Sequence, residues 1–201
     1  MLRGLCAGLA ALLIMPSSFA VAQEWELVRD EEGIRVWLKP VAGSSYKAFR
    51  SETLMNTDMA TLRKLQEDVE ASCAWIHSCR EQRLLSYEGD TALTYTRFDT
   101  PWPVQARDSV MQVTTRVGEG GSLLRELLAQ PQQFPPDKAY QRISAAQGYW
   151  RMTPEGEGRI RVVYELHAEP GGQVPAWLAN SFVIDAPYNT LLLLRRAAEA
   201  K

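Results

Sequence analysis

Alternating apolar and polar side chains run through most of this chain, which is typical of strands that bury one face. Short segments rich in Gly, Asp or Pro separate many of these runs, such as residues 31–33, 88–90 and 118–122. Turns of that length join antiparallel neighbours, so the pattern predicts a largely antiparallel sheet. We expect strands over residues 25–30, 34–38, 46–54, 80–86, 92–99, 108–117, 123–129, part of 139–152, and 159–168.

Two segments show helical rather than alternating periodicity. Within residues 58–71, apolar side chains recur at three- and four-residue spacing, and Asn56 and Thr57 offer N-caps. Residues 175–198 are apolar on nearly every side, which a helix tolerates only where neighbouring elements cover it. Because Pro187 removes a backbone donor in mid-helix, we expect it to bend this helix or divide it in two.

The long apolar helix decides the fold class. It needs cover, and the expected sheet can supply it, so the pattern predicts a single α+β domain in which the helix packs across a curved antiparallel sheet. Two interpretations stay open. Either the helix fills a solid core, or one stretch roofs a cavity with Asn180, Ser181 and Asp185 as its few polar groups.

The first residues predict export from the cell. Arg3 precedes an apolar run over residues 5–15, and the small residues Ala20-Val21-Ala22 form a cleavage motif. The run is too short to span a bilayer. We therefore expect a cleaved signal peptide over residues 1–22, a mature domain over 23–201, and a periplasmic or secreted protein.

The expected compartment indicates the state of the cysteines. An oxidising environment favours a disulfide between Cys73 and Cys79. A metal site that also used His77 would have two thiolates and one imidazole, which leaves the coordination of zinc incomplete. We expect the disulfide and no metal.

Charge and motifs exclude several classes of function. The formal net charge is −2 and no basic cluster is present, which disfavours nucleic acid as a partner. The two histidines, His77 and His167, lie in no recognisable catalytic spacing. The chain also lacks a zinc-protease helix signature, a nucleophile elbow, a P-loop and a dinucleotide-binding glycine motif. We expect no catalytic residues and no cofactor.

Several segments, in order along the chain, carry a family resemblance. They are Trp25 with DEEGIRV at 30–36, TPWPV at 100–104 leading to Arg107-Asp108, GYW at 148–150, and EPGGQVPAWLAN at 169–180. Together they resemble the START (StAR-related lipid-transfer) family, particularly its exported bacterial members. The resemblance implies a helix-grip fold, in which a curved sheet wraps around the C-terminal helix. It also implies a tunnel that binds and transfers one lipid or other hydrophobic molecule, gated by that helix and neighbouring loops.

Candidate site residues follow from the implied tunnel. Tyrosine and tryptophan combine apolar surface with one hydrogen-bonding atom, which suits an amphipathic ligand. If Arg97 points inward, it would attract an anionic headgroup. We give Arg107 and Asp108 structural roles, since each can satisfy other buried polar groups. The expected cavity wall comprises Tyr95, Arg97, Trp102, Met111, Trp150 and Tyr164 from the sheet side, and Leu178, Ser181, Phe182 and Asp185 from the helix.

The resemblance also narrows the ligand. In cholesterol-binding relatives an acidic and a basic residue meet inside the tunnel, and the corresponding positions here, Thr94 and Val113, carry no charge. A fatty acid, a phospholipid or a polyketide-like molecule is therefore expected in preference to a sterol. We expect a monomer that makes transient contact with membranes.

Two other functions compete with lipid binding. The same pocket could serve a polyketide cyclase or aromatase, which would need two titratable groups converging inside, such as Asp185 with Arg97 or a tyrosine. Alternatively, the cavity is collapsed and the domain is a periplasmic interaction module.

Overall fold

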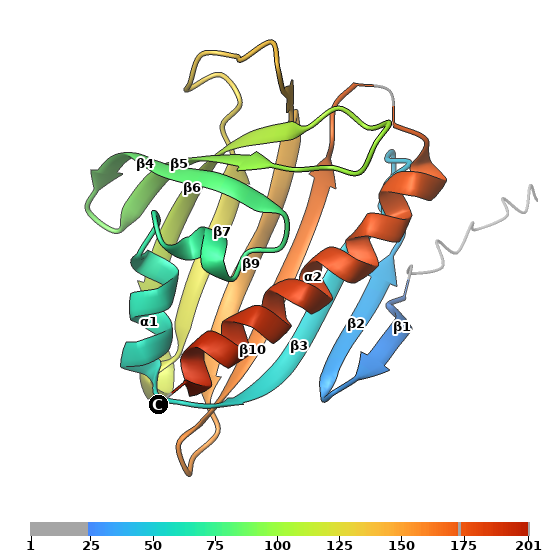
Figure 1. The fold of residues 1–201 in the computed structure, drawn as a ribbon. Helices are drawn as coiled ribbons and strands as arrows, with labels where there is room; N and C mark the ends of the chain where they lie inside the picture. The colour runs from blue at the N-terminus through green and yellow to red at the C-terminus, as the bar shows by residue number, and fades with distance from the viewer. Residues whose placement is uncertain (1–23, 173, 201) are drawn as a thin grey trace, which may run out of the picture.

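The computed structural model describes residues 24–172 and 174–200, and it confirms the expected α+β architecture (Figure 1). One curved, almost entirely antiparallel sheet holds ten strands in the order β1-β2-β3-β10-β9-β7-β6-β5-β4, with the short β8 pairing in parallel with β6. The strands are β1 (Glu26–Glu31), β2 (Ile34–Lys39), β3 (Ala48–Asn56), β4 (Cys79–Glu88), β5 (Thr91–Phe98), β6 (Arg107–Val117), β7 (Leu123–Ala129), β8 (Gln141–Arg142), β9 (Ala145–Pro154) and β10 (Arg159–Glu169).

The C-terminal helix α2 (Ala176–Glu199) crosses the concave face of the sheet, where it packs on β2 and β3 (Figure 1). It is one uninterrupted helix, so the expectation that Pro187 divides it is wrong. Pro187 is fully buried together with Leu191 and Leu194. Packing of these apolar side chains offsets the backbone hydrogen bond that the proline cannot donate.

The helix α1 (Met59–Glu67) covers the other end of the concave face. It is shorter than expected, because the chain leaves the helix at Asp68 and forms a separate 3₁₀ turn, η1 (Ser72–Ala74). Its N-cap is Asp58 rather than Asn56 or Thr57, since the Asp58 carboxylate accepts a hydrogen bond of 2.8 Å from the Thr61 backbone N–H.

The strand register fixes which side chains share the concave face. Residues directly opposite one another in an antiparallel ladder point the same way. Val162 of β10 lies opposite Met152 of β9 and Thr53 of β3, and all three are buried beneath the helices. The core on this face contains Ile34, Val36, Met55, Leu62, Trp75, Leu123, Trp150, Met152, Ile160, Val162, Tyr188, Leu191, Leu194 and Ala198.

Gly148 lies on the concave face at the point where β9 approaches β10 most closely. A Cβ atom at this position would lie 2.1 Å from the carbonyl oxygen of Glu165 and 2.7 Å from the Cα of Leu166. No side chain can occupy that space, so the absence of one lets the two strands approach there.

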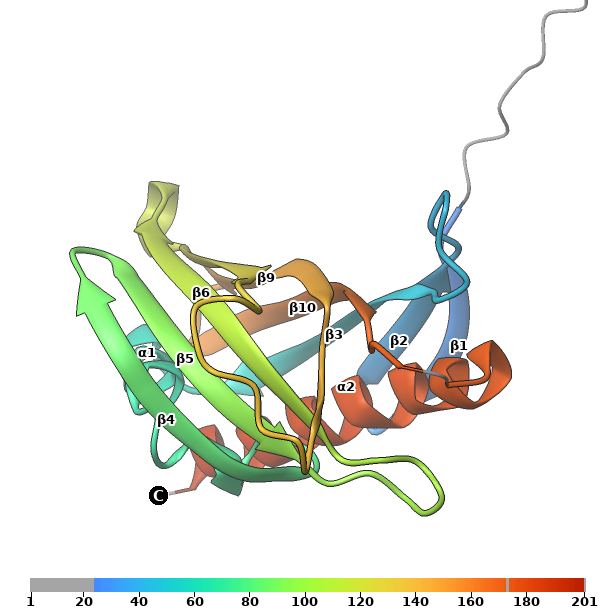
Figure 2. The same ribbon diagram turned by 90° about the horizontal axis from the view of Figure 1, so that it is seen from above.

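The convex face is also covered in part. The connection between β7 and β9 passes over β5 and β6 (Figure 2) and places the Phe134 ring 4.7 Å from the ring of Tyr95. As a result, consecutive residues of β5 are all buried, although they alternate between the two faces of the sheet: Thr94, Tyr95 and Thr96.

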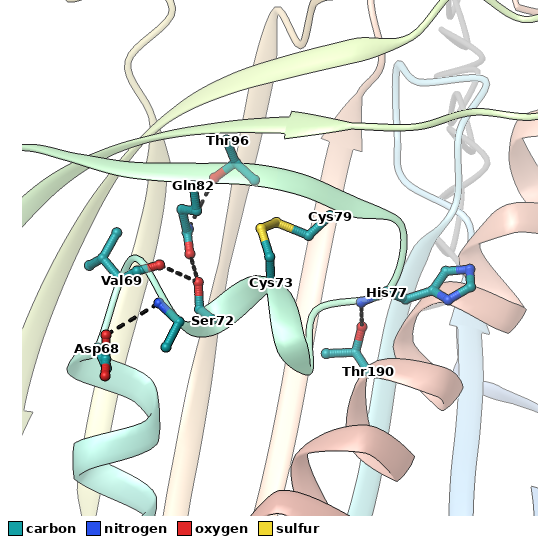
Figure 3. Close-up of a disulfide and its surroundings, with 10 residues drawn as sticks. Asp68, Val69, Ser72, Cys73, His77, Cys79, Gln82, Thr96 and Thr190 are labelled. Atoms are coloured by element: carbon teal, nitrogen blue, oxygen red, sulfur yellow. Dashed lines mark hydrogen bonds between the residues drawn. A yellow bond between two sulfur atoms is a disulfide. The ribbon is translucent and has the colours of Figure 1, made fainter.

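The expected disulfide is confirmed: Cys73 is bonded to Cys79 (Figure 3). The segment that it closes is also tied to the long helix, because the His77 backbone N–H donates to the Thr190 hydroxyl over 3.1 Å. Trp75 within this segment is buried, with its ring centroid 5.9 Å from that of Trp150. The bridged segment therefore forms one wall of the space between the sheet and α2.

Candidate ligand-binding site

Two clefts open where the N-terminal part of α2 meets the β5–β6 connection, which extends toward that helix (Figure 1). The larger has a volume of 680 Å³ and the smaller, more apolar one a volume of 180 Å³. Val104, Arg107 and Phe182 line both of them. The clefts therefore lie side by side at one end of the space between helix and sheet, and we call this region the mouth.

Polar contacts hold the other side of the mouth in place. The Lys47 backbone N–H donates to the side-chain oxygen of Asn180 over 3.0 Å, and the Tyr46 hydroxyl donates to the carbonyl of Val174 over 3.1 Å. These contacts join the β2–β3 connection to the first turns of α2 and to the residues just before that helix. The rim of the mouth thus comes from segments far apart in the sequence.

Three of the expected cavity residues meet at the mouth. Trp102, Leu178 and Phe182 all line the larger cleft. Trp102 is 92% exposed, so its indole stands at the outer rim rather than inside the protein.

Three more expected residues lie on the concave face. The rings of Trp150 and Tyr164 stack with centroids 3.9 Å apart, and the Phe49 ring meets Tyr164 edge-on at 4.9 Å. The register places Met111 on the same face, opposite Thr94 on one side and Ala129 on the other. Met111 is half-buried, so it keeps part of its accessible surface.

The Tyr164 hydroxyl lies deep in the protein but has no hydrogen-bond partner among the described residues. Burial raises its pKa well above the ordinary value, and no neighbouring charge contributes to that shift. Tyr164 nevertheless keeps part of its accessible surface. A deep side chain that retains accessible surface is not completely enclosed by close-packed neighbours.

Tyr95 and Arg97 do not join this group. They lie on the convex face, since Asp108, directly opposite Arg97, is bound there by Arg142. The Tyr95 hydroxyl donates to Asp108 over 3.0 Å, and the Arg97 guanidinium pairs with Glu81 at 2.8 Å and with Asp137 at 3.0 Å. These partners explain why Tyr95 and Arg97 lie on the convex face, because their polar groups find hydrogen-bond and ion-pair partners beneath the β7–β9 connection.

Asp185 also lies away from the concave space. It faces β1, where its carboxylate pairs with Arg29 at 3.0 Å, and its side chain is 63% exposed. The Arg29 guanidinium also stacks 3.6 Å above the ring of Tyr188, which fastens the helix to the edge strand. The side chain of Ser181 lies outside the described part of the structure.

The structural role expected for Asp108 matches its surroundings. It is 1% exposed and binds Arg142 and Tyr95. Arg107 is buried as well, but it points to the opposite face and lines the mouth. Side chains alternate along a strand, so neighbours such as Arg107 and Asp108 must face opposite sides of β6. That alternation was available in the sequence, and it separates the surroundings of Arg107 from those of Asp108.

A family model described as the START domain matches residues 19–186 of this chain. The chain belongs to the START family. It is 47% identical to the uncharacterized protein PA1579 of Pseudomonas aeruginosa over 193 residues, which cover 96% of each chain. The phosphatidylcholine transfer protein of Rattus norvegicus is 26% identical over 164 residues, or 78% of this chain and 75% of that protein.

Solved START structures share the architecture described above. The crystal structure of the STAR-related lipid transfer protein from Xanthomonas axonopodis superposes with a TM-score of 0.82 at 32% sequence identity. The match covers 88% of this chain and 99% of that one. The expected helix-grip fold is therefore confirmed for this START domain.

Neither a metal-binding cluster nor a membrane-spanning helix occurs among the described residues. They contain no cluster of three or more His, Cys, Asp or Glu side chains arranged to hold a metal ion. No helix within residues 24–172 and 174–200 combines the length and apolar character needed to cross a membrane.

Proposed function

We propose that this START domain binds one lipid or other hydrophobic molecule between the concave face of its sheet and α2. The observation that carries the proposal is Tyr164, a deep residue that keeps accessible surface and whose hydroxyl has no hydrogen-bond partner among the described residues. An acyl chain of about fifteen carbons costs roughly 12 kcal/mol to expose to water. A hollow with aromatic walls and a few polar groups removes that cost.

The ligand enters through the mouth between the β5–β6 connection and the start of α2. Trp102, Leu178 and Phe182 give this entrance an apolar lining that an acyl chain can cross. The exposed indole of Trp102 contacts the membrane transiently while the ligand passes. Relatives named for lipid transfer, from Rattus norvegicus and Xanthomonas axonopodis, support a carrier role.

The protein performs this role as a monomer outside the cytoplasm, after cleavage of the signal peptide over residues 1–22. The Cys73–Cys79 disulfide is compatible with an exported protein. Residues 1–22 themselves lie outside the described part of the chain.

The polyketide cyclase alternative gains no support from the residues that it would need. Asp185 pairs with Arg29 beside β1, whereas Arg97 pairs with Glu81 and Asp137 on the convex face. These two groups therefore do not converge on one space. We accordingly propose a binding protein without covalent chemistry.

Native mass spectrometry of the purified protein, followed by lipid extraction, tests the proposal. We expect a mass increment that matches one bound lipid or, for ligand-free protein, stoichiometric uptake of an added fatty acid or phospholipid. If the protein neither carries nor takes up any hydrophobic molecule, the domain is an interaction module with a collapsed cavity and the proposal is wrong.

A further inference from the structure

Arg107, the first residue of β6, is a buried cation without an acidic partner. Its relative exposure is 7%. Among the residues that the structure describes, its guanidinium donates only to two backbone carbonyls, those of Gln105 and of Gly171, the latter over 3.3 Å. Among the described residues no carboxylate lies within ion-pair distance of it. Burial lowers its pKa from the ordinary value of an arginine, with only Tyr46 acting in the opposite direction.

Two arginines on the convex face, Arg142 and Arg97, are paired with carboxylates. Arg142 is also largely buried, but it binds both carboxylate oxygens of Asp108, at 2.8 and 2.9 Å. Arg97 pairs with Glu81 and Asp137. A buried guanidinium that keeps its charge requires an anion or several good acceptors, and two carbonyls use two of its five N–H groups.

Within residues 24–172 and 174–200, Arg125 is the other buried arginine without an ion pair, and it differs from Arg107 in position. It donates to the backbone carbonyl and the side-chain oxygen of Gln66, at the C-terminal end of α1, and to the Thr115 hydroxyl. A cation at a helix C-terminus stabilises the exposed carbonyls there. Arg125 therefore has a structural explanation, whereas Arg107 lines both clefts of the mouth.

A second positive feature faces the same cleft. Pro175 is the N-cap of α2 and makes no side-chain capping hydrogen bond, and the first turn of the helix contains no acidic residue. Pro175 and Leu178 line the larger cleft together with Arg107. The first N–H groups of a long helix carry a partial positive charge that favours an anion nearby.

We propose that Arg107, together with the N-terminal end of α2, binds the anionic headgroup of the ligand at the mouth, so that this START domain selects carboxylate- or phosphate-bearing amphiphiles over neutral ones. The proposal rests on the proposed function, because the apolar part of the same molecule occupies the concave space. When the headgroup binds, it replaces the carbonyls of Gln105 and Gly171 as acceptors for the guanidinium. These two carbonyls belong to the β5–β6 connection and to the chain before α2, so anion binding changes the contacts of both rim segments.

Ligand pairs that differ only in the headgroup test this selection. One arm compares dodecanoate with dodecanol, and the other compares dioctanoyl phosphatidate with dioctanoylglycerol, each by displacement of a neutral fluorescent probe. We expect the charged member to bind about tenfold or more tightly in at least one arm. A tenfold ratio of dissociation constants corresponds to the free energy of about one charge-assisted hydrogen bond. Preference in the first arm identifies a free fatty acid, and preference in the second identifies an anionic phospholipid.

Variants of Arg107 test whether this residue causes the preference for charged ligands. Arg107→Gln should remove the preference while the neutral ligand keeps its affinity within about twofold, and Arg107→Lys should retain part of the preference. Arg97→Gln, on the convex face, is the matched control and should leave the preference unchanged. The wild-type comparison needs no variant, so the proposal stays testable even if Arg107→Gln does not fold.

The two proposals fail in different ways. Equal affinity of the wild-type protein for the charged and neutral members overturns the role of an anionic headgroup but leaves hydrophobic binding intact. A full preference retained by Arg107→Gln likewise overturns the assignment to Arg107. Binding of none of the four ligands, by contrast, overturns the proposed function itself.

Discussion

Asp108 and Arg142 form a two-point ion pair on the convex face, with Nε–Oδ1 and Nη2–Oδ2 distances of 2.8 and 2.9 Å. Arg142 also donates to carbonyls of the β7–β9 connection, including those of Pro131 and Phe134. The pair therefore fastens this connection over β5 and β6, and it shields the buried Tyr95 from water.

Asp108→Ala should lower the free energy of unfolding by about 3–5 kcal/mol, because it leaves the Arg142 guanidinium without its anion. Urea denaturation measures the change. Glu126→Ala, which removes the exposed ion pair with Arg116, is the control and should cost no more than about 1 kcal/mol. Equal losses in the two variants would contradict a special role for the buried pair.

Tyr164→Phe should stabilise the ligand-free protein by up to about 1 kcal/mol, because it removes a deep hydroxyl that has no partner. The same variant should bind a ligand that hydrogen-bonds to this hydroxyl several-fold more weakly. Tyr149→Phe provides the contrast: its hydroxyl donates to Glu165 over 3.0 Å, so this variant should lose about 1 kcal/mol. Thermal unfolding and titration with a lipid separate the two effects, and destabilisation by Tyr164→Phe would argue against the hollow.

Replacing both Cys73 and Cys79 by serine should lower the free energy of unfolding by about 2 kcal/mol, because the unfolded chain gains the entropy of a short open loop. Denaturation with and without a reductant measures this loss. A reductant should destabilise the wild-type protein and leave the double variant unaffected. If a reductant also destabilised the double variant, the Cys73–Cys79 disulfide would not be the cause of the loss of stability.

Protonation of Asp58, the N-cap of α1, should lower the stability of the protein in acid. The Thr61 backbone N–H holds the pKa of Asp58 below its ordinary value of 3.8. A carboxylate whose pKa is lowered by folding stabilises the native state above the unfolded-state value and loses that contribution as pH falls through the folded-state value. Asp58→Asn should therefore show a shallower loss of thermal stability below about pH 4. Identical acid profiles of the two proteins would remove Asp58 from this response.

Trp102→Ser should slow transfer of a bound fluorescent lipid to vesicles, because it removes the exposed indole at the rim of the mouth. The free energy of unfolding should change by less than about 0.5 kcal/mol. Tyr87→Ser, which removes another exposed aromatic side chain on β4, is the control and should transfer lipid at the wild-type rate. Equal rates for the wild type and Trp102→Ser would exclude the indole from transfer.

The alternating pattern predicted the strands well but could not orient β5. Its two faces carry Thr94 and Thr96 on one side and Tyr95 on the other, and all three residues are buried. Apolar character favoured Tyr95 as the inward residue. The connection that covers Tyr95 follows β7 in the sequence. The pattern of residues within β5 therefore could not predict that the convex face of this strand is buried.

The helix was predicted closely, but the orientation of its polar residues was not. Asn180 faces the β2–β3 connection and Asp185 faces β1, so each polar group has a partner outside the concave space. Their partners, Lys47 and Arg29, are more than a hundred residues away in sequence. Only the folded arrangement brings such distant groups together, which is why the candidate site was predicted less completely than the fold.

In the described part of the chain the sheet does not close on itself, since β1 and β4 are its two end strands and pair with no strand beyond β2 and β5. The N-terminal half of α2 is held to β1 chiefly through side chains, such as Arg29 with Asp185. Displacement of the helix would therefore enlarge the interior without breaking a single rung of the ladder. For the ligand binding that we propose, the sheet would stay fixed while the space beneath the start of the helix changes in size, so that ligands of different bulk fit against the same set of strands.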